Sequence, residues 1–146
     1  MNRVFDFSAK MSRAYCAVCK PLCRELGLPQ TAFDILMFLG NNPEYHTARD
    51  IVETRHIPAN LVSVHVDRLV REGYLTRQQD KCDRRKTMLL CTGKAQSVIA
   101  RGRQLQNAFF ERTIADTDEN ARNAFLSVLE TIEKNLDKIL ENEAVL

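Results

Sequence analysis

Apolar residues recur at intervals of three and four over long stretches of this chain, which is the spacing that aligns side chains along one face of a helix. Residues 4–26 form the first such stretch, and Gly27 marks its end. A second stretch begins after Thr31, a residue type that caps helices, and stops at the Gly-Asn-Asn-Pro sequence of residues 40–43. The stripe of the first predicted helix consists of Phe7, Met11, Ala14, Val18 and Leu22.

The centre of the chain predicts two short helices joined by a tight turn. Thr47 is placed to cap a helix over residues 48–54. Pro58, which is tolerated at a first helical position, opens a longer helix that ends before Gly73. Only three residues separate the two, so the arrangement is a helix-turn-helix. The buried side of its second helix is predicted to be Val62, Val66, Leu69 and Val70.

Two strands are predicted directly after the helix-turn-helix. Residues 74–78 and 86–91 read as strands, and the polar residues 79–85 between them include two Asp, one Lys and two Arg. A hairpin with a charged tip in this position is a wing. Two further helices follow, one over residues 94–112 and one that Thr117 caps. The sequence therefore predicts a mainly α winged helix-turn-helix fold with six helices and one β-hairpin.

The first predicted helix carries more apolar surface than one packed side requires, and the last one has a broad apolar stripe. Cys16, Cys19 and Cys23 lie beside the stripe of the first helix and widen its apolar surface to more than half the circumference. A helix of this kind is expected to be buried on two sides, and a dimer would supply the second side. The last helix has a broad stripe formed by Phe125, Val128, Leu129, Ile132, Leu136, Ile139 and Leu140.

Charge is unevenly distributed, although the net charge of +2 is small. Residues 47–94 hold ten Lys or Arg against six Asp or Glu, whereas residues 107–146 hold four against nine. The helix-turn-helix and wing are therefore suited to face an anion, and the C-terminal region is not. The N-terminal residues lack the apolar core of a signal peptide and no later run approaches a membrane span, so we expect a cytoplasmic protein with no membrane partner.

Several short strings resemble the MarR family of bacterial regulators, and the resemblance covers nearly the whole chain. They are Cys-Lys-Pro-Leu with Glu-Leu-Gly-Leu at residues 19–22 and 25–28, Val-Asp-Arg-Leu with Gly-Tyr-Leu-Thr-Arg at 66–69 and 73–77, Asp-Arg-Arg at 83–85, and Cys-Thr at 91–92. Three positions depart from the family. Val64 stands where an Arg is frequent, His56 where the turn often has Gly, and Ala95 where a Gly follows the wing.

The resemblance implies a repressor-like transcription regulator that binds double-stranded DNA as a homodimer, with its two winged domains in successive major grooves of a pseudo-palindromic operator. It also implies a small aromatic or lipophilic effector, bound between the dimer helices and the DNA-binding lobe. We expect one chain unit over residues 1–146, with the winged lobe in residues 31–92. The helical dimerisation region is expected in residues 1–28 and 93–146.

No cofactor, metal site or enzymatic activity is expected. His46, His56 and His65 have no Ser, Cys or carboxylate at a spacing typical of a catalytic site, and the chain has no glycine-rich phosphate loop.

The open face of the second helix of the helix-turn-helix is predicted to read bases. Asn pairs with adenine through two hydrogen bonds, Ser bonds several base edges, and an exposed Val64 or Leu61 suits a thymine methyl group. The predicted contacts of this helix are Asn60, Leu61, Ser63, Val64, Arg68 and Arg71.

The wing and the start of the preceding helix supply the remaining predicted contacts. A wing guanidinium can enter a narrow minor groove, and by resemblance this is the role of Arg85, with Asp83 orienting it or pairing with Arg77. Outward-pointing backbone donors favour phosphate contacts at Thr47 and Arg49. The predicted contacts outside the recognition helix are Thr47, Arg49, Arg77, Asp83, Arg84, Arg85 and Lys86.

The three cysteines of the first helix leave alternatives open. They share one helix face, which fits small buried side chains at a packed interface. A zinc site would need further ligands that the neighbouring sequence lacks, whereas a thiol-based redox sensor needs only accessible thiols. A second alternative is a winged-helix protein interaction module without specific DNA binding, suggested by Val64 and by Asp67 on the open face. A thiol-disulfide enzyme is suggested only by Cys16 and Cys19.

Overall fold

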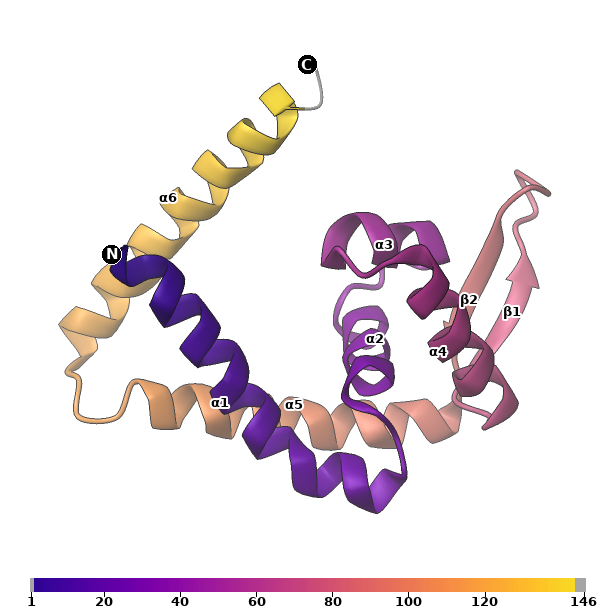
Figure 1. The fold of residues 1–146 in the computed structure, drawn as a ribbon, viewed down its shortest axis with the longest axis horizontal. Coiled ribbons are helices and arrows are strands. Elements are labelled where there is room, and N and C mark those ends of the chain that lie inside the picture. Colours follow the sequence, from indigo (N-terminus) through magenta and orange to yellow (C-terminus); the bar gives the residue numbers. More distant parts are fainter. Residues whose placement is uncertain (1, 144–146) are drawn as a thin grey trace. The chain divides into compact units, whose positions relative to one another are not determined.

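Along the described residues, 2–143, the computed structural model has six helices and one two-stranded antiparallel sheet, which confirms the predicted fold class (Figure 1). The elements are α1 (Arg3–Leu26), α2 (Gln30–Asn41), α3 (Ala48–Arg55), α4 (Ala59–Arg71), β1 (Leu75–Gln79), β2 (Thr87–Cys91), α5 (Gly93–Thr113) and α6 (Glu119–Glu143). The chain divides into two compact units, one ending at Phe109 and the other beginning at Phe110. Helix α5 crosses that boundary.

Helix α2 is the centre of the core of the first unit. Seven of its twelve residues are buried, as expected for a helix that is apolar nearly all round. Helix α5 packs against it at Gly102, where an added Cβ would overlap the sulfur of Met37. The glycine therefore allows the two helices to approach closely.

Two of the predicted helix caps are wrong. Thr31 lies inside α2, whose N-cap is Pro29 and makes no side-chain capping bond. The fixed φ of proline sets the extended conformation that precedes this helix. At α6, Asp118 rather than Thr117 accepts a hydrogen bond from the backbone N–H of Ala121, at 2.7 Å. The Thr117 hydroxyl instead donates to a carbonyl of the preceding turn.

The helix-turn-helix forms where the sequence predicts it. Thr47 caps α3 as expected, and Pro58 lies one position before the first residue of α4, as its N-cap. His56 connects the helices in the left-handed conformation, with a φ of 52°. Glycine adopts this conformation at the lowest cost, which gives a physical reason why a Gly is common at this position of the family.

The wing is a regular hairpin. Leu75 of β1 lies opposite Cys91 of β2, and Gln79 lies opposite Thr87. The backbone N–H of Leu89 donates to the carbonyl of His46 at 2.7 Å, so the segment before α3 is attached to the edge of β2. This bond fixes the wing relative to the start of the helix-turn-helix.

Helices α1 and α6 keep much of their apolar surface exposed. In α1, Leu22 is buried with Cys19 and Cys23, but Phe7 remains 55% exposed. No described residue of α6 is buried, so its whole predicted stripe is open in the single chain. In the part of the chain that the structure describes, no helix has both the length and the apolar character needed to cross a membrane.

Candidate nucleic-acid interface

Helix α4 has the two faces that the sequence predicts. Its inward side buries Val62, Val66 and Leu69, because these residues recur every three or four positions and meet the core. The opposite side is open, and Val64 is 62% exposed at its middle. The predicted contacts that are exposed on this helix are Asn60, Leu61, Ser63, Val64 and Arg71.

Arg68 is directed away from the other predicted contacts of α4. Its Nε donates to Glu72 Oε1 at 3.0 Å, and its other guanidinium nitrogen donates to the carbonyl of Gly27 at 2.6 Å. Gly27 is the C-cap of α1, in the left-handed conformation. Arg68 therefore joins α4 to the end of α1, and its guanidinium is occupied by these two contacts.

Arg77 pairs with Asp67 and not with Asp83, so that part of the sequence prediction is wrong. The Arg77 guanidinium on β1 donates to a carboxylate oxygen of Asp67 on α4, and both side chains are partly exposed. The pairing is possible because β1 runs back along α4, a proximity that sequence spacing does not reveal. It also neutralises the one acidic side chain on the open face of α4.

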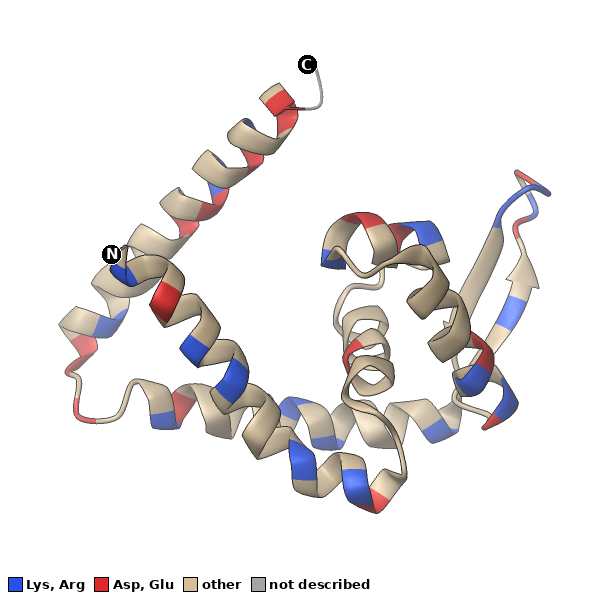
Figure 2. Ribbon diagram, viewed as in Figure 1, with Lys and Arg blue, Asp and Glu red and all other residues tan. Residues whose placement is uncertain are grey.

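The wing tip uses its acidic side chains to hold the turn. Asp83 Oδ1 accepts from the backbone N–H of Arg85 at 3.0 Å, and Asp80 Oδ1 accepts from that of Cys82 at 2.9 Å. Asp83 thus orients the backbone at Arg85, as short acidic residues often do in turns. Among the described residues no ion pair involves Arg84, Arg85 or Lys86, and all three are exposed. Lys and Arg gather near this tip in Figure 2.

The start of α3 is less open to a phosphate than the sequence suggests. Thr47 Oγ1 accepts from the N–H of Asp50 at 3.1 Å, and Asp50 Oδ2 accepts from the N–H of Thr47 at 2.9 Å. Partial burial alone would raise the pKa of Asp50, but hydrogen bonds from His46 and Thr47 lower it overall. An ionised carboxylate therefore already occupies the positive end of the helix dipole. Arg49 remains exposed and pairs with Glu53 at 2.7 Å.

Three elements bring predicted contacts together around one shallow hollow. It has a volume of about 420 Å³ and is bounded by Arg49 of α3, Ser63 of α4 and Arg77 of β1. Its two arginines, Arg49 and Arg77, are paired with Glu53 and Asp67 and lie beside the open face of α4. This is the arrangement that backbone-positioning and base-reading contacts require.

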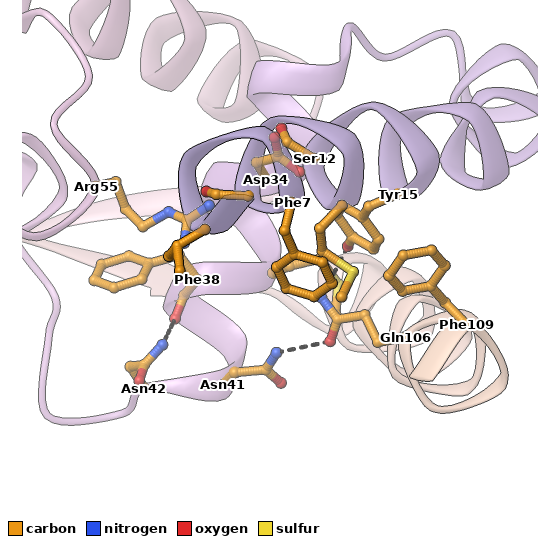
Figure 3. Close-up of a pocket in the computed structure, with 14 residues that line it drawn as sticks. Phe7, Ser12, Tyr15, Asp34, Phe38, Asn41, Asn42, Arg55, Gln106 and Phe109 are labelled. Atoms are coloured by element: carbon orange, nitrogen blue, oxygen red, sulfur yellow. Dashed lines mark hydrogen bonds between the residues drawn. The ribbon is translucent and has the colours of Figure 1, made fainter. Parts of the chain in front are cut away.

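A second cavity, of about 550 Å³, lies among α1, α2 and α5 of the first unit, and the sequence reasoning assigned no residue to it. Figure 3 shows the rings of Phe7, Tyr15, Phe38 and Phe109 around it. Its charged lining residues are Asp34 and Arg55. Asp34 is the one charged residue in the sequence of α2. A lone charge in an otherwise uncharged helix is the sequence feature that could have indicated this cavity.

The cysteines of α1 occupy different environments. Cys19 and Cys23 are buried, whereas Cys16 is exposed. Burial raises the pKa of Cys23 to about 11, and it raises the pKa of Cys19 as well. Within the described residues, no group of three or more His, Cys, Asp or Glu side chains is arranged to hold a metal ion.

Solved structures share this fold over most of the chain. A MarR protein from Peptoclostridium difficile DA00132 matches with a TM-score of 0.80 and 20% identity, over 94% of this chain and 89% of that one. A MarR family regulator from Listeria monocytogenes, solved with 26mer DNA, matches at 0.81 with 18% identity, over 93% and 90%. BpsR of Bordetella bronchiseptica, whose DNA binding is regulated by 6-hydroxynicotinic acid, matches at 0.69 with 17% identity, over 90% and 99%.

The sequence comparison agrees over the helix-turn-helix and wing. No curated protein sequence matches the chain. The MarR family model matches residues 26–86, from the end of α1 to the wing tip. Residues 26–86 are therefore similar to the MarR family, and the chain has the fold of solved MarR proteins.

Proposed function

We propose that the protein is a sequence-specific DNA-binding regulator that represses transcription as a homodimer on a pseudo-palindromic operator. The observation that carries the proposal is the open face of α4, which lies beside a wing whose Arg84, Arg85 and Lys86 are exposed. An exposed helix face of this width fits a major groove, and a cationic hairpin tip fits the adjacent minor groove. The Listeria monocytogenes relative in complex with DNA supports the same use of the fold.

The proposed dimer rests on the exposed apolar surfaces of α1 and α6. Val4 and Phe5 near the start of α1 are 67% and 73% exposed. Ile132 and Leu136 on α6 are 46% and 52% exposed. An apolar stripe exposed along a helix marks an interaction site in a soluble protein. A second copy of the chain would cover it and would supply the second winged lobe that a two-fold operator needs.

The cavity among α1, α2 and α5 is the proposed effector site. Its volume of about 550 Å³ lies in the range of small-molecule sites, and its aromatic walls suit a flat ring. A ligand that binds more tightly to the geometry unable to grip DNA would release the operator by population shift. BpsR, whose DNA binding is regulated by 6-hydroxynicotinic acid, supports a small aromatic effector for a protein of this fold.

Two substitutions separate the work of the wing from that of α4. Arg85→Ala should weaken operator binding by roughly 1 to 3 kcal/mol, because it removes a guanidinium that contacts DNA while the Asp83 bond to the backbone at this position keeps the turn. Asn60→Ala should relax base preference at one position in each half-site. Fluorescence anisotropy with the operator and with single-base variants measures both effects.

Lys20→Ala is the matched control, since Lys20 is an exposed cation on α1 outside the proposed interface. It should bind like the parent protein. If Arg85→Ala binds normally while Lys20→Ala does not, the proposed docking of the wing is wrong.

The cysteines test the redox-sensor alternative. Cys16 should react quickly with a thiol reagent in the native protein, and Cys19 and Cys23 should not, because burial keeps them inaccessible and protonated. Mild peroxide should leave operator affinity unchanged. The triple Cys→Ser variant at these positions should lose about 1 to 3 kcal/mol of stability for each buried hydroxyl but still bind DNA at low temperature.

A different response to peroxide would identify the protein as a thiol-based redox sensor. Peroxide would abolish operator binding by the parent, a reductant would restore it, and the triple variant would resist peroxide.

A further inference from the structure

The cavity among α1, α2 and α5 has two charged lining residues that differ in exposure. Of the fourteen residues that line it, Asp34 and Arg55 carry charge. Asp34 is half-buried in the wall formed by α2, whereas Arg55, at the end of α3, is exposed. Water screens an exposed charge more strongly than a half-buried one. The carboxylate is therefore the less screened of the two charges.

Asp34 has capacity for another partner. Its Oδ1 accepts a hydrogen bond from Gln30 Nε2 at 2.9 Å. Among the described residues no ion pair closes on this carboxylate. Burial raises its pKa, while Gln30 and the more distant charge of Arg55 lower it. A positively charged group in the cavity would stabilise the ionised carboxylate more than Arg55 does.

The aromatic walls act in the same direction. The cavity is bordered by the rings of Phe7, Tyr15, Phe38 and Phe109, and one face of Phe38 is covered by the ring of Tyr45, stacked at 5.5 Å. The face of an aromatic ring is negative in electrostatic character, which favours a cation beside it. An anionic ligand would meet the like charge of Asp34 in a partly desolvated place, which disfavours it.

We propose that this cavity takes a flat aromatic molecule that carries a protonated amine, with the amine paired to Asp34 and the ring among the four aromatic side chains. The proposal rests on the proposed function of the cavity as the effector site and names the class of ligand. It also links the ligand to the helix-turn-helix, because Arg55 is the last residue of α3 and directly precedes the His56 turn. A bound cation repels Arg55, so occupied and empty cavities place different forces on that turn.

Isothermal titration with three matched probes tests the charge preference. The probes are 1-naphthylmethylammonium, neutral 1-naphthylmethanol and 1-naphthoate, each titrated into the parent protein at pH 7. The ammonium compound should bind at least about tenfold more tightly than the carboxylate. Equal or tighter binding of 1-naphthoate would overturn the proposal, as would the absence of binding by all three probes.

Substitutions assign the preference to its residues. Asp34→Asn keeps an oxygen acceptor for Gln30, and it should weaken binding of the ammonium probe about tenfold while changing binding of the alcohol less than about twofold. Arg55→Gln is at an exposed site and should strengthen ammonium binding about two- to fivefold. Arg24→Gln, an exposed arginine outside the cavity, is the control and should have no effect. If neither cavity variant differs from the control, the pairing with Asp34 is wrong.

Operator binding is measured in parallel on the same preparations. If the parent protein binds its operator but does not prefer the ammonium probe, the proposed ligand class is wrong and the proposed regulatory function stands. If the protein prefers the ammonium probe but binds no operator, the proposed regulatory function is wrong and the proposed ligand class stands. If Asp34→Asn does not fold, the titrations of the parent protein and of Arg55→Gln still test the charge preference of the cavity.

Discussion

Raising the salt concentration from 50 to 200 mM should weaken operator binding by about three to five decades, which is the loss expected when a protein displaces counterions from roughly six to ten phosphates. The structure supplies cations in this number. The exposed cations near the proposed interface of each protomer include Arg49, Arg71, Arg84, Arg85 and Lys86. A dimer doubles that set. Anisotropy titrations at four salt concentrations give the slope of log affinity against log salt.

A single charge removal calibrates the slope. Arg84→Gln should reduce the salt slope by about one for each phosphate that the protein no longer neutralises, with similar weakening for every DNA sequence. Salt-insensitive binding, or no binding to any promoter fragment, would favour the alternative of an interaction module. The Asp67–Arg77 ion pair removes one reason for that alternative, because Asp67 is neutralised within the chain.

Local patterns predicted most of the fold. The spacing of apolar residues located the helices. Capping residues located several helix termini, such as Thr47 at the start of α3 and Gly27 at the end of α1. The two wrong N-cap predictions lie where adjacent residues could each serve as the N-cap. At α6, Thr117 and Asp118 are adjacent and both can cap, and only the path of the chain decides between them.

The candidate interface was predictable only in part. Exposure of Asn60, Val64 and the wing cations follows from helical spacing and turn composition. Pairings between elements do not follow from either. The hydrogen bond between Arg68 and Gly27 joins residues 41 positions apart in the sequence. This bond and the Arg77–Asp67 ion pair both depend on how the helices and strands pack. The cavity was missed for the same reason, since residues from four helices line it.

The double substitution Ile132→Glu and Leu136→Glu should convert the protein to a monomer and reduce operator affinity at least about 100-fold. Both side chains lie on the exposed apolar stripe of α6. A carboxylate buried in an apolar interface without a partner costs several kcal/mol, so two of them should prevent association. Affinity falls because two linked lobes gain roughly two to four decades over one. Sedimentation velocity reports mass, and anisotropy reports operator binding.

The matched control places the same change in charge on the polar side of the same helix. Ser127→Glu with Lys134→Gln also lowers the charge by two, and both positions lie opposite the apolar stripe. This variant should remain a dimer and bind the operator within about threefold of the parent, because its altered charges lie far from the proposed phosphate contacts in sequence and on a solvent-facing helix side. Circular dichroism shows whether each variant keeps its helices. A folded Ile132→Glu, Leu136→Glu protein that still sediments as a dimer would exclude the α6 stripe from the interface. One that sediments as a monomer yet binds the full operator like the parent would exclude the requirement for a dimer.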